Sequence, residues 1–164
     1  VLAVLFSPDS EVLYVSTSDG VISAIEIETG NTLWQRIGSG VDVVDMANVK
    51  KRGAILTATA SNVIQLIDAD TGEVLESSDT SGAPLRDVVV FPDNNRFATT
   101  LSDGTVGIWS IEQFGLVASF SAVQSMECID VSSDGYILAV GGGNATIQFM
   151  DGMSHGARHS NTKK

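Results

Sequence analysis

The sequence predicts an all-β fold built from four copies of one antiparallel sheet. Three observations indicate this fold class. One unit recurs through nearly all of the 164 residues. Each copy contains short runs rich in Val, Ile, Leu and Tyr, bounded by Gly, Pro, Asn and Asp, which is typical of strands joined by tight turns. No sustained stripe of apolar residues at helical spacing interrupts these runs.

The clearest part of the repeat is a strand-turn-strand segment. It reads GVISAIEIETGNTLWQ, NVIQLIDADTGEVLES, GTVGIWSIEQFGLVAS and, more faintly, ATIQFMDGMSHGARHS. The four segments begin at residues 20, 62, 104 and 145, so they lie 42, 42 and 41 residues apart. A period of about 40 to 45 residues with four strands per unit is typical of β-propeller blades.

Each copy divides into strands in the same order. In the first copy the apolar runs and turns predict strands at about 1–6, 11–17, 21–27 and 31–37. The later copies open with VDVVDMANVKKRGAILTATA, LRDVVVFPDNNRFATTLS and MECIDVSSDGYILAVGGG, and the first of these carries two extra residues around Lys50-Lys51-Arg52. After TIQFMD no apolar fourth strand follows. We expect blades at about 1–40, 41–84, 85–124 and 125–151, and a polar tail without fixed structure at 152–164.

The run Asp68-Ala69-Asp70-Thr71-Gly72 raises the question of a ligand loop. A calcium loop needs several oxygen ligands with a distal Glu, and a phosphate cradle needs Gly-x-x-x-x-Gly-Lys before a helix. Neither pattern is present. The run is therefore predicted to be the turn between the third and fourth strands, where Gly accepts a positive φ and Asp and Thr bond nearby amides.

The repeat resembles the WD40-repeat family of β-propellers over nearly the whole chain. The segments FSPDSEVLYVSTSDGVISAIE and FPDNNRFATTLSDGTVGIWS carry the resemblance. The family's Gly-His pair is missing, so the family's Trp–Ser/Thr–His–Asp tetrad cannot form. The motif in ETGNTLW also resembles quinoprotein dehydrogenase blades, which are propellers too. The positions of the family's Trp-Asp pair are occupied here by Ile25-Glu26, Ile67-Asp68, Trp109-Ser110 and Met150-Asp151, none of which is the full Trp-Asp dipeptide.

The WD40 resemblance implies about seven blades, although four-bladed propellers exist. Four blades arranged as an open fan would leave sheet faces uncovered at both ends. We therefore expect these blades to be the C-terminal part of a larger propeller, completed by a missing N-terminal segment. The rival expectation is that two copies of the chain associate.

The net charge of −11 restricts the class of partner. It makes nucleic acid and anionic membranes unlikely partners and favours a basic protein or peptide. No run reaches the length of about 18 to 20 apolar residues that a membrane helix needs, so no membrane role is expected. Cys128 is the only cysteine, which rules out an intrachain disulfide and favours an intracellular, cytoplasmic or nuclear, location.

The sequence offers no catalytic, metal or cofactor site. It contains no paired nucleophile and base, no metal-ligand cluster and no phosphate loop. Cys128 lies in the apolar run MECIDV and is expected to be a buried, inert thiol. His155 and His159 lie in the polar tail, where Gly156 opposes the helix that a metal pair would need.

Three acidic residues form the candidate partner-binding site. The resemblance implies docking on the face that holds the strand 4–1 linkers and the strand 2–3 turns, with the first residues of strand one as contacts. Alignment on Phe6, Met46, Phe91 and Val131 gives Leu2, Asp42, Asp87 and Glu127 one common position. Clustered carboxylates at Asp42, Asp87 and Glu127 would hold an Arg- or Lys-rich segment. The alternative reading is a solvated edge in a chain that is acidic throughout.

The predicted function is a non-catalytic protein-interaction scaffold acting in a multi-protein complex. A rigid set of strands that presents its loops to a partner fits this role. Two alternatives remain open. One is a fragment of a propeller enzyme of the quinoprotein type, and the other is an RNA-associated subunit of a ribonucleoprotein.

Overall fold

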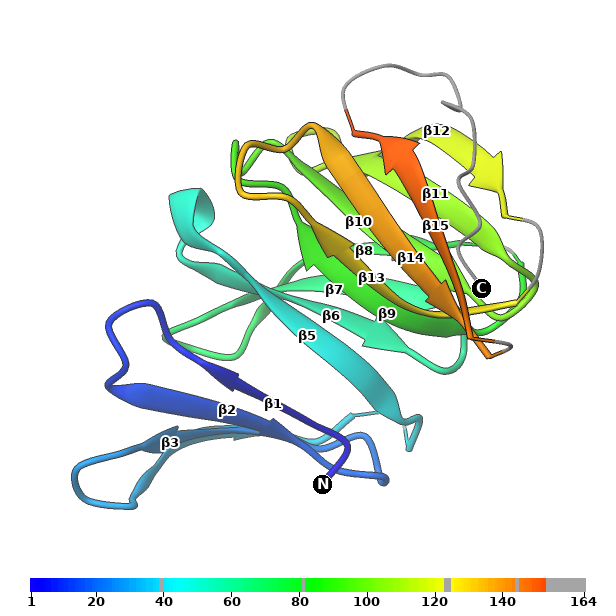
Figure 1. Ribbon diagram of the computed structural model, residues 1–164. Coiled ribbons are helices and arrows are strands. Elements are labelled where there is room, and N and C mark those ends of the chain that lie inside the picture. The colour runs from blue at the N-terminus through cyan, green and yellow to red at the C-terminus, as the bar shows by residue number, and fades with distance from the viewer. Residues whose placement is uncertain (39, 81, 123–124, 144, 153–164) are drawn as a thin grey trace. The chain divides into compact units, whose positions relative to one another are not determined.

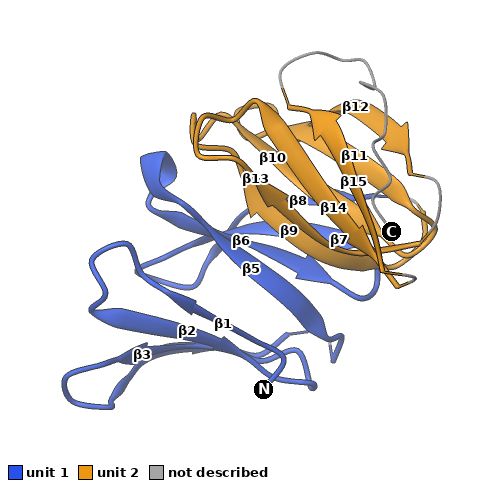
Figure 2. Ribbon diagram, in the orientation of Figure 1, with its two compact units in different colours: residues 1–81 blue, residues 82–164 orange. Residues whose placement is uncertain are grey.

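The computed structural model describes residues 1–38, 40–80, 82–122, 125–143 and 145–152. These residues form fifteen strands and one short 3-10 helix (Figure 1). The chain divides into two compact units, residues 1–81 and residues 82–164 (Figure 2).

The first unit holds two antiparallel sheets, each of four strands in sequence order. Sheet 1 consists of β1 (Ala3–Phe6), β2 (Val12–Ser16), β3 (Ile22–Glu26) and β4 (Thr32–Arg36). Sheet 2 consists of β5 (Val43–Val49), β6 (Ala54–Thr59), β7 (Val63–Asp68) and β8 (Val74–Asp79). The helix η1 (Lys50–Arg52) accommodates the two extra residues of this copy between β5 and β6.

The second unit repeats the arrangement with one strand fewer in its described part. Sheet 3 consists of β9 (Leu85–Val90), β10 (Arg96–Leu101), β11 (Thr105–Ser110) and β12 (Gly115–Ser121). Sheet 4 consists of β13 (Met126–Val131), β14 (Ile137–Gly142) and β15 (Thr146–Asp151). The predicted all-β class, with the four-stranded antiparallel blade as the repeated unit, is confirmed. The predicted tail, including His155 and His159, lies outside the described residues except for Gly152.

The pairing registers identify equivalent positions in the four sheets. Leu13, Ile55, Phe97 and Leu138 share one position at the start of the second strand, each paired with both strand one and strand three. In each of the first three sheets, a residue four positions later accepts, through its carbonyl, the hydrogen bond that closes the turn between strands two and three. Those turn bonds run from the amides of Gly20, Asn62 and Gly104 to the carbonyls of Thr17, Thr59 and Leu101.

In the first unit, sheets 1 and 2 pack face to face around an apolar cluster. Sheet 1 contributes Tyr14, Ile22 and Ala24, and sheet 2 contributes Val43, Met46, Ile55 and Ile67. Hydrogen bonds also cross between the two sheets. The Ser16 hydroxyl donates to the Val43 carbonyl at 3.0 Å, and the Asn48 amide donates to the Phe6 carbonyl at 2.8 Å.

In the second unit the packing uses equivalent positions. Ile129, Leu138 and Met150 of sheet 4 join one buried cluster with Ala98, Val106 and Ile108 of sheet 3. In both units the later sheet therefore buries the same three strand positions against the earlier sheet.

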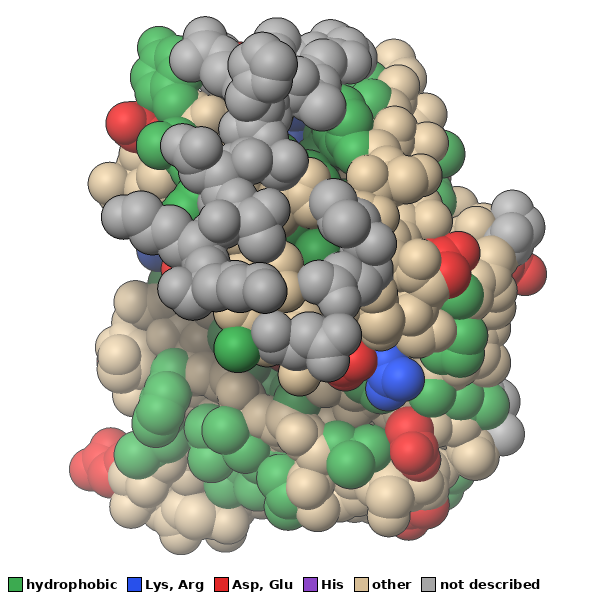
Figure 3. All heavy atoms as spheres, turned by 45° about the vertical axis from the view of Figure 1, so that its right-hand side comes forward, with side chains coloured by type: hydrophobic (Ala, Val, Ile, Leu, Met, Phe, Trp, Pro, Cys, Tyr) green, Lys and Arg blue, Asp and Glu red, His purple; other side chains and the backbone are tan. Residues whose placement is uncertain are grey.

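The opposite face of sheet 1 is open. Val4, Leu13 and Ile25 hold the positions that Met46, Ile55 and Ile67 hold in sheet 2. Val4 is 59% exposed, whereas Met46 is 5% exposed. The outer face of sheet 4 likewise exposes Ile137, Ile147 and Phe149. Hydrophobic side chains lie at the surface between scattered acidic ones on the face shown in Figure 3.

The Asp-Ala-Asp-Thr-Gly run is a turn, as predicted. One Asp68 carboxylate oxygen accepts hydrogen bonds from the amides of Asp70 (3.0 Å) and Thr71 (2.8 Å) and from the Thr71 hydroxyl (2.9 Å). The bonds from Thr71 lower the pKa of Asp68. Gly72 has a φ of 74°, and a Cβ there would lie 2.6 Å from the Trp34 ring. The turn therefore needs glycine both for its backbone and for its contact with Trp34.

Two further kinds of feature are absent from the described residues. No group of three or more His, Cys, Asp and Glu side chains is placed to hold a metal ion there. No helix in that part of the chain combines the length and apolar character needed to cross a bilayer.

Candidate partner-binding surface

Asp42 lies in the linker between β4 and β5, at the edge of the first unit. Its carbonyl accepts the Ala60 amide at 2.9 Å, which fixes the linker to the turn between β6 and β7. The residue is half-buried. Asp42 therefore lies at the edge made by a strand 4–1 linker and a strand 2–3 turn, the kind of edge predicted for docking.

Asp87 has its carboxylate engaged inside the second unit. One carboxylate oxygen accepts the Val88 amide at 2.9 Å, and the other accepts the Ile129 amide at 2.8 Å. The second bond connects β9 of sheet 3 to β13 of sheet 4. Asp87 therefore holds two sheets together, whatever else it binds.

Glu127 is exposed at the start of β13. Its Oε2 lies 3.7 Å from Nε of Arg86, and its Oε1 accepts the Ser125 hydroxyl at 3.3 Å. Both members of the Arg86–Glu127 pair are about half exposed, so solvent screens the attraction. Glu127 can exchange this weak partner for another cation.

The three carboxylates do not share one strand position, which corrects the alignment used to choose them. The amide of Phe91 bonds across its turn as those of Ser7 and Ser132 do, so Phe91 is equivalent to these residues and not to Phe6.

Asp87 lies opposite Thr100, a position that Asp45 holds in sheet 2 and Cys128 in sheet 4. Bulges in the first strands of sheets 2, 3 and 4 displace the register. Sequence alignment without gaps cannot show these bulges.

Replacing the Asp87 carboxylate tests its structural role. Asp87→Ala is expected to lower the free energy of unfolding by about 1–3 kcal/mol, because the Ile129 amide loses its acceptor. Glu127→Gln is the matched control in the same unit and should leave the urea midpoint unchanged, since its ion pair is exposed. Equal midpoints for both variants would contradict this role. Urea unfolding followed by circular dichroism measures the difference.

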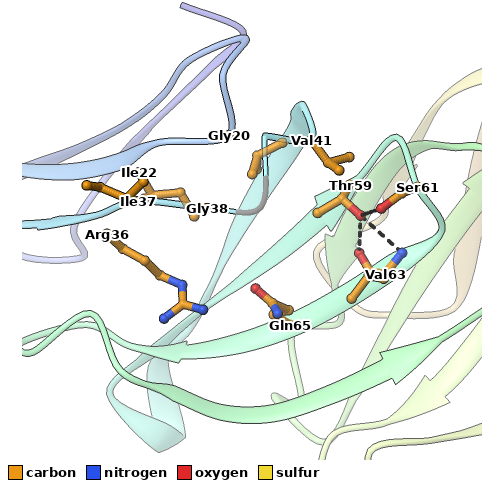
Figure 4. A pocket seen from close by; sticks show the side chains of 11 residues that line it. Gly20, Ile22, Arg36, Ile37, Gly38, Val41, Thr59, Ser61, Val63 and Gln65 are labelled. Atoms are coloured by element: carbon orange, nitrogen blue, oxygen red, sulfur yellow. Dashed lines mark hydrogen bonds between the residues drawn. The ribbon is translucent and has the colours of Figure 1, made fainter.

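A pocket of about 170 Å³ opens at the same edge of the first unit as Asp42. Its walls come from the β2–β3 turn, the end of β4, the β4–β5 linker and the β6–β7 turn. Figure 4 shows Arg36 from β4 and Gln65 from β7 projecting into this space. Neither Arg36 nor Gln65 was predicted from the sequence to be a site residue.

Part of the WD40 tetrad survives in sheet 3. The indole Nε1 of Trp109 donates to the Thr99 hydroxyl at 3.0 Å, and both residues are buried. The full tetrad was not expected to form, and this remaining pair was not predicted from the sequence. Its signal was the Trp at the family's Trp-Asp position, with a Thr on the preceding strand.

Cys128 was expected to be buried, and this expectation is wrong. The side chain is exposed, with its sulfur 3.9 Å from the Gly141 carbonyl. Side chains alternate along β13, and the buried face toward sheet 3 holds the next residue, Ile129.

Comparisons with known proteins agree with the repeat. The family model "WD domain, G-beta repeat" matches residues 73–110. The chain is similar to telomerase protein component 1 of Rattus norvegicus, with 24% identity over 150 residues. It is also similar to apoptotic protease-activating factor 1 of Danio rerio (26% over 160 residues) and autophagy-related protein 16 of Arabidopsis thaliana (26% over 120 residues).

These similarities cover most of the chain but a small part of each relative. They span 90%, 89% and 71% of this chain, and 6%, 12% and 24% of the respective relatives. The repeat period, the four-stranded antiparallel sheets, the Trp109–Thr99 pair and the family match agree with one another. Residues 73–110 match the WD40 repeat, and the chain resembles WD40-repeat proteins in its repeat and its sheets.

Proposed function

We propose that the chain is a non-catalytic interaction scaffold that binds a protein or peptide and acts in a multi-protein complex. The observation that carries the proposal is the edge of the first unit, where a linker and two turns on a rigid sheet pair surround an open pocket. Loops held by such a scaffold are the usual place for recognition. The match of residues 73–110 to the family model "WD domain, G-beta repeat" supports the proposal.

The chemistry of the partner follows from charge. A net charge of −11 attracts basic segments over distances of about one Debye length, roughly 8 Å in physiological salt. In this proposal Asp42 of the first unit and Glu127 of the second each offer a carboxylate to a basic segment, while Asp87 is mainly occupied by backbone amides. An intracellular location, with the single cysteine as support, belongs to the same proposal.

A fluorescein-labelled arginine-rich peptide tests the proposed basic partner. Fluorescence anisotropy should show binding that weakens as salt is raised. The double variant Asp42→Asn, Glu127→Gln is expected to weaken binding by about five- to tenfold, because two carboxylate contacts are lost. Asp87 is left unchanged in this variant, so that a loss of binding cannot arise from separation of sheets 3 and 4.

Glu112→Gln supplies the matched control. Glu112 is an exposed carboxylate in the turn between β11 and β12, which lies at the opposite end of its sheet from the strand 2–3 turn. The Glu112→Gln substitution removes one negative charge and leaves the proposed contacts unchanged, so binding of the peptide should stay within twofold of the parent chain. A loss of binding that matches the double variant would mean that net charge alone attracts the peptide, and the assignment of Asp42 and Glu127 would fail.

A further inference from the structure

We infer that the pocket between sheets 1 and 2 binds a single carboxylate, presented by a glutamate or aspartate side chain of a partner peptide. The inference deepens the proposed function, on which it rests only in assuming that the partner is a peptide. The pocket would bind a negatively charged group, whereas Asp42 and Glu127 would bind positively charged groups.

Arg36 is the reason to expect an anion. Among the described residues that line the pocket it is the only charged side chain, and none of them is a carboxylate. Among the described residues its guanidinium has no ion pair or hydrogen-bond partner. The residue is half-buried, so an unpaired charge there has lost part of its hydration. A carboxylate would restore those interactions through two parallel hydrogen bonds.

The second unit shows that an arginine is not required at this position for packing. Arg36 pairs with Ile22 across β3 and β4, and the equivalent pair in sheet 3 is Phe120 and Val106. Phe120 packs against the apolar cluster between sheets 3 and 4. In the first unit, the polar fork of Arg36 replaces this aromatic side chain and leaves open space between the sheets.

The rest of the lining suits a side chain with a short apolar stem. Ile22, Val41, Val43 and Val63 offer apolar contacts for methylene groups, and the Gln65 amide projects into the same space (Figure 4). In the turn behind them, the Thr59 hydroxyl is already engaged with the Val63 carbonyl at 2.9 Å. The head group would therefore meet Arg36 and Gln65.

The rim of the pocket is held in place by close backbone contacts. A Cβ added to Gly38 would lie 2.2 Å from the Gly20 carbonyl oxygen, and one added to Gly20 would lie 2.6 Å from the Val41 carbonyl oxygen. The β4–β5 linker thus packs directly on the β2–β3 turn. This close approach of two backbone segments forms one side of the pocket rim.

The single cation favours a carboxylate over a phosphate. Phosphate sites usually combine several donors with more than one positive charge, whereas one arginine balances one carboxylate. The chain's net charge of −11 adds repulsion that grows with the ligand's charge.

Nuclear magnetic resonance titration of the ¹⁵N-labelled chain tests the inference. The probe is N-acetyl-glutamate N-methylamide, and its neutral counterpart is N-acetyl-glutamine N-methylamide, at constant ionic strength. We expect saturable shifts of the Gly38, Ser61 and Gln65 amides and of the Arg36 Nε–H, with a dissociation constant of about 1–20 mM. The glutamine probe should bind at least fivefold more weakly.

Three variants locate the binding energy. R36Q should abolish the shifts, and R36K, which keeps the charge but loses the fork, should weaken binding several-fold. R86Q is the matched control, because it removes an arginine of the other unit and should leave the titration unchanged. A dispersed spectrum of R36Q establishes that it folds.

Three results would overturn the inference. The first is equal binding of the glutamate and glutamine probes. The second is the absence of shifts at about 50 mM glutamate probe, a concentration at which even a single contact should be detected. The third is tighter binding of inorganic phosphate than of the glutamate probe. Because the probe carries no arginine, its failure leaves the proposed basic partner untouched. Failure of the arginine-rich peptide likewise leaves the carboxylate pocket untouched.

Discussion

Trp109→Ala is expected to lower the free energy of unfolding by about 3–5 kcal/mol. Trp109 is 5% exposed and stacks on Phe97, with ring centroids 5.8 Å apart and planes within 5°. Its indole also donates to the buried Thr99 hydroxyl at 3.0 Å. Truncation removes apolar burial and the stack, and leaves that hydroxyl without its donor.

Two smaller changes separate these contributions. Thr99→Val removes the acceptor and leaves the indole N–H unpaired, so we expect a loss of about 1–2 kcal/mol. Trp109→Phe keeps a ring over Phe97 and should cost less than the alanine variant. Urea unfolding followed by circular dichroism gives all three values. A loss under about 1 kcal/mol for Trp109→Ala would contradict a packed centre in sheet 3.

The Trp109 and Thr99 side chains leave no room for a Cβ atom at Gly107. A Cβ at Gly107 would lie 2.6 Å from the Trp109 Nε1 and 3.0 Å from the Thr99 hydroxyl. The glycine therefore makes room for the hydrogen bond that remains from the WD40 tetrad. The sequence places this glycine inside a strand, but the need for glycine depends on Trp109 of the same strand and Thr99 of the neighbouring strand.

Strand positions could be predicted from the sequence because local signals determine them. The strands expected at 11–17, 21–27 and 31–37 are observed at Val12–Ser16, Ile22–Glu26 and Thr32–Arg36. Apolar runs set the interior of each strand, and Gly, Asp and Pro set its ends. The expected absence of a fourth strand after TIQFMD concerns residues that lie outside the described part of the chain, except for Gly152.

Registers could not be predicted in the same way. A bulge moves every later residue of a strand by one position relative to its partner, and no local signal in the first strands marks the bulges. Asp87 and Cys128 share a position opposite the second strand, although the sequence alignment separated them. Both the bond from the Ile129 amide to Asp87 and the exposure of Cys128 follow from this register.

The pocket also could not be predicted from the sequence, although an arginine at an inward-facing strand position indicates it. The fourth strands TLWQR and LVASF align so that Arg36 and Phe120 face the neighbouring sheet of their units. A cation at an inward position is a reason to look for an anionic ligand. Recognising it requires the register, because a shift of one residue would place Arg36 on the outer face.

Ile55→Ala and Leu13→Ala should differ by about 2 kcal/mol or more, although the two residues hold the same position in neighbouring sheets. Ile55 is fully buried between sheets 1 and 2, so its truncation leaves a cavity and should lower the free energy of unfolding by about 2–4 kcal/mol. Leu13 lies on the open face of sheet 1 and is half-buried, so its truncation should cost less than about 1 kcal/mol.

The size of this difference reports whether another sheet covers sheet 1. If a further blade, from a longer chain or from a second copy, packed on Val4, Leu13 and Ile25, Leu13→Ala would become as costly as Ile55→Ala, since both sites would then be buried alike. Urea unfolding of the isolated chain at several concentrations, together with sedimentation analysis, distinguishes the cases. An uncovered sheet 1 gives a small, concentration-independent loss for Leu13→Ala, whereas self-association gives a loss that grows with protein concentration. A large loss in a strictly monomeric chain would contradict the open face itself.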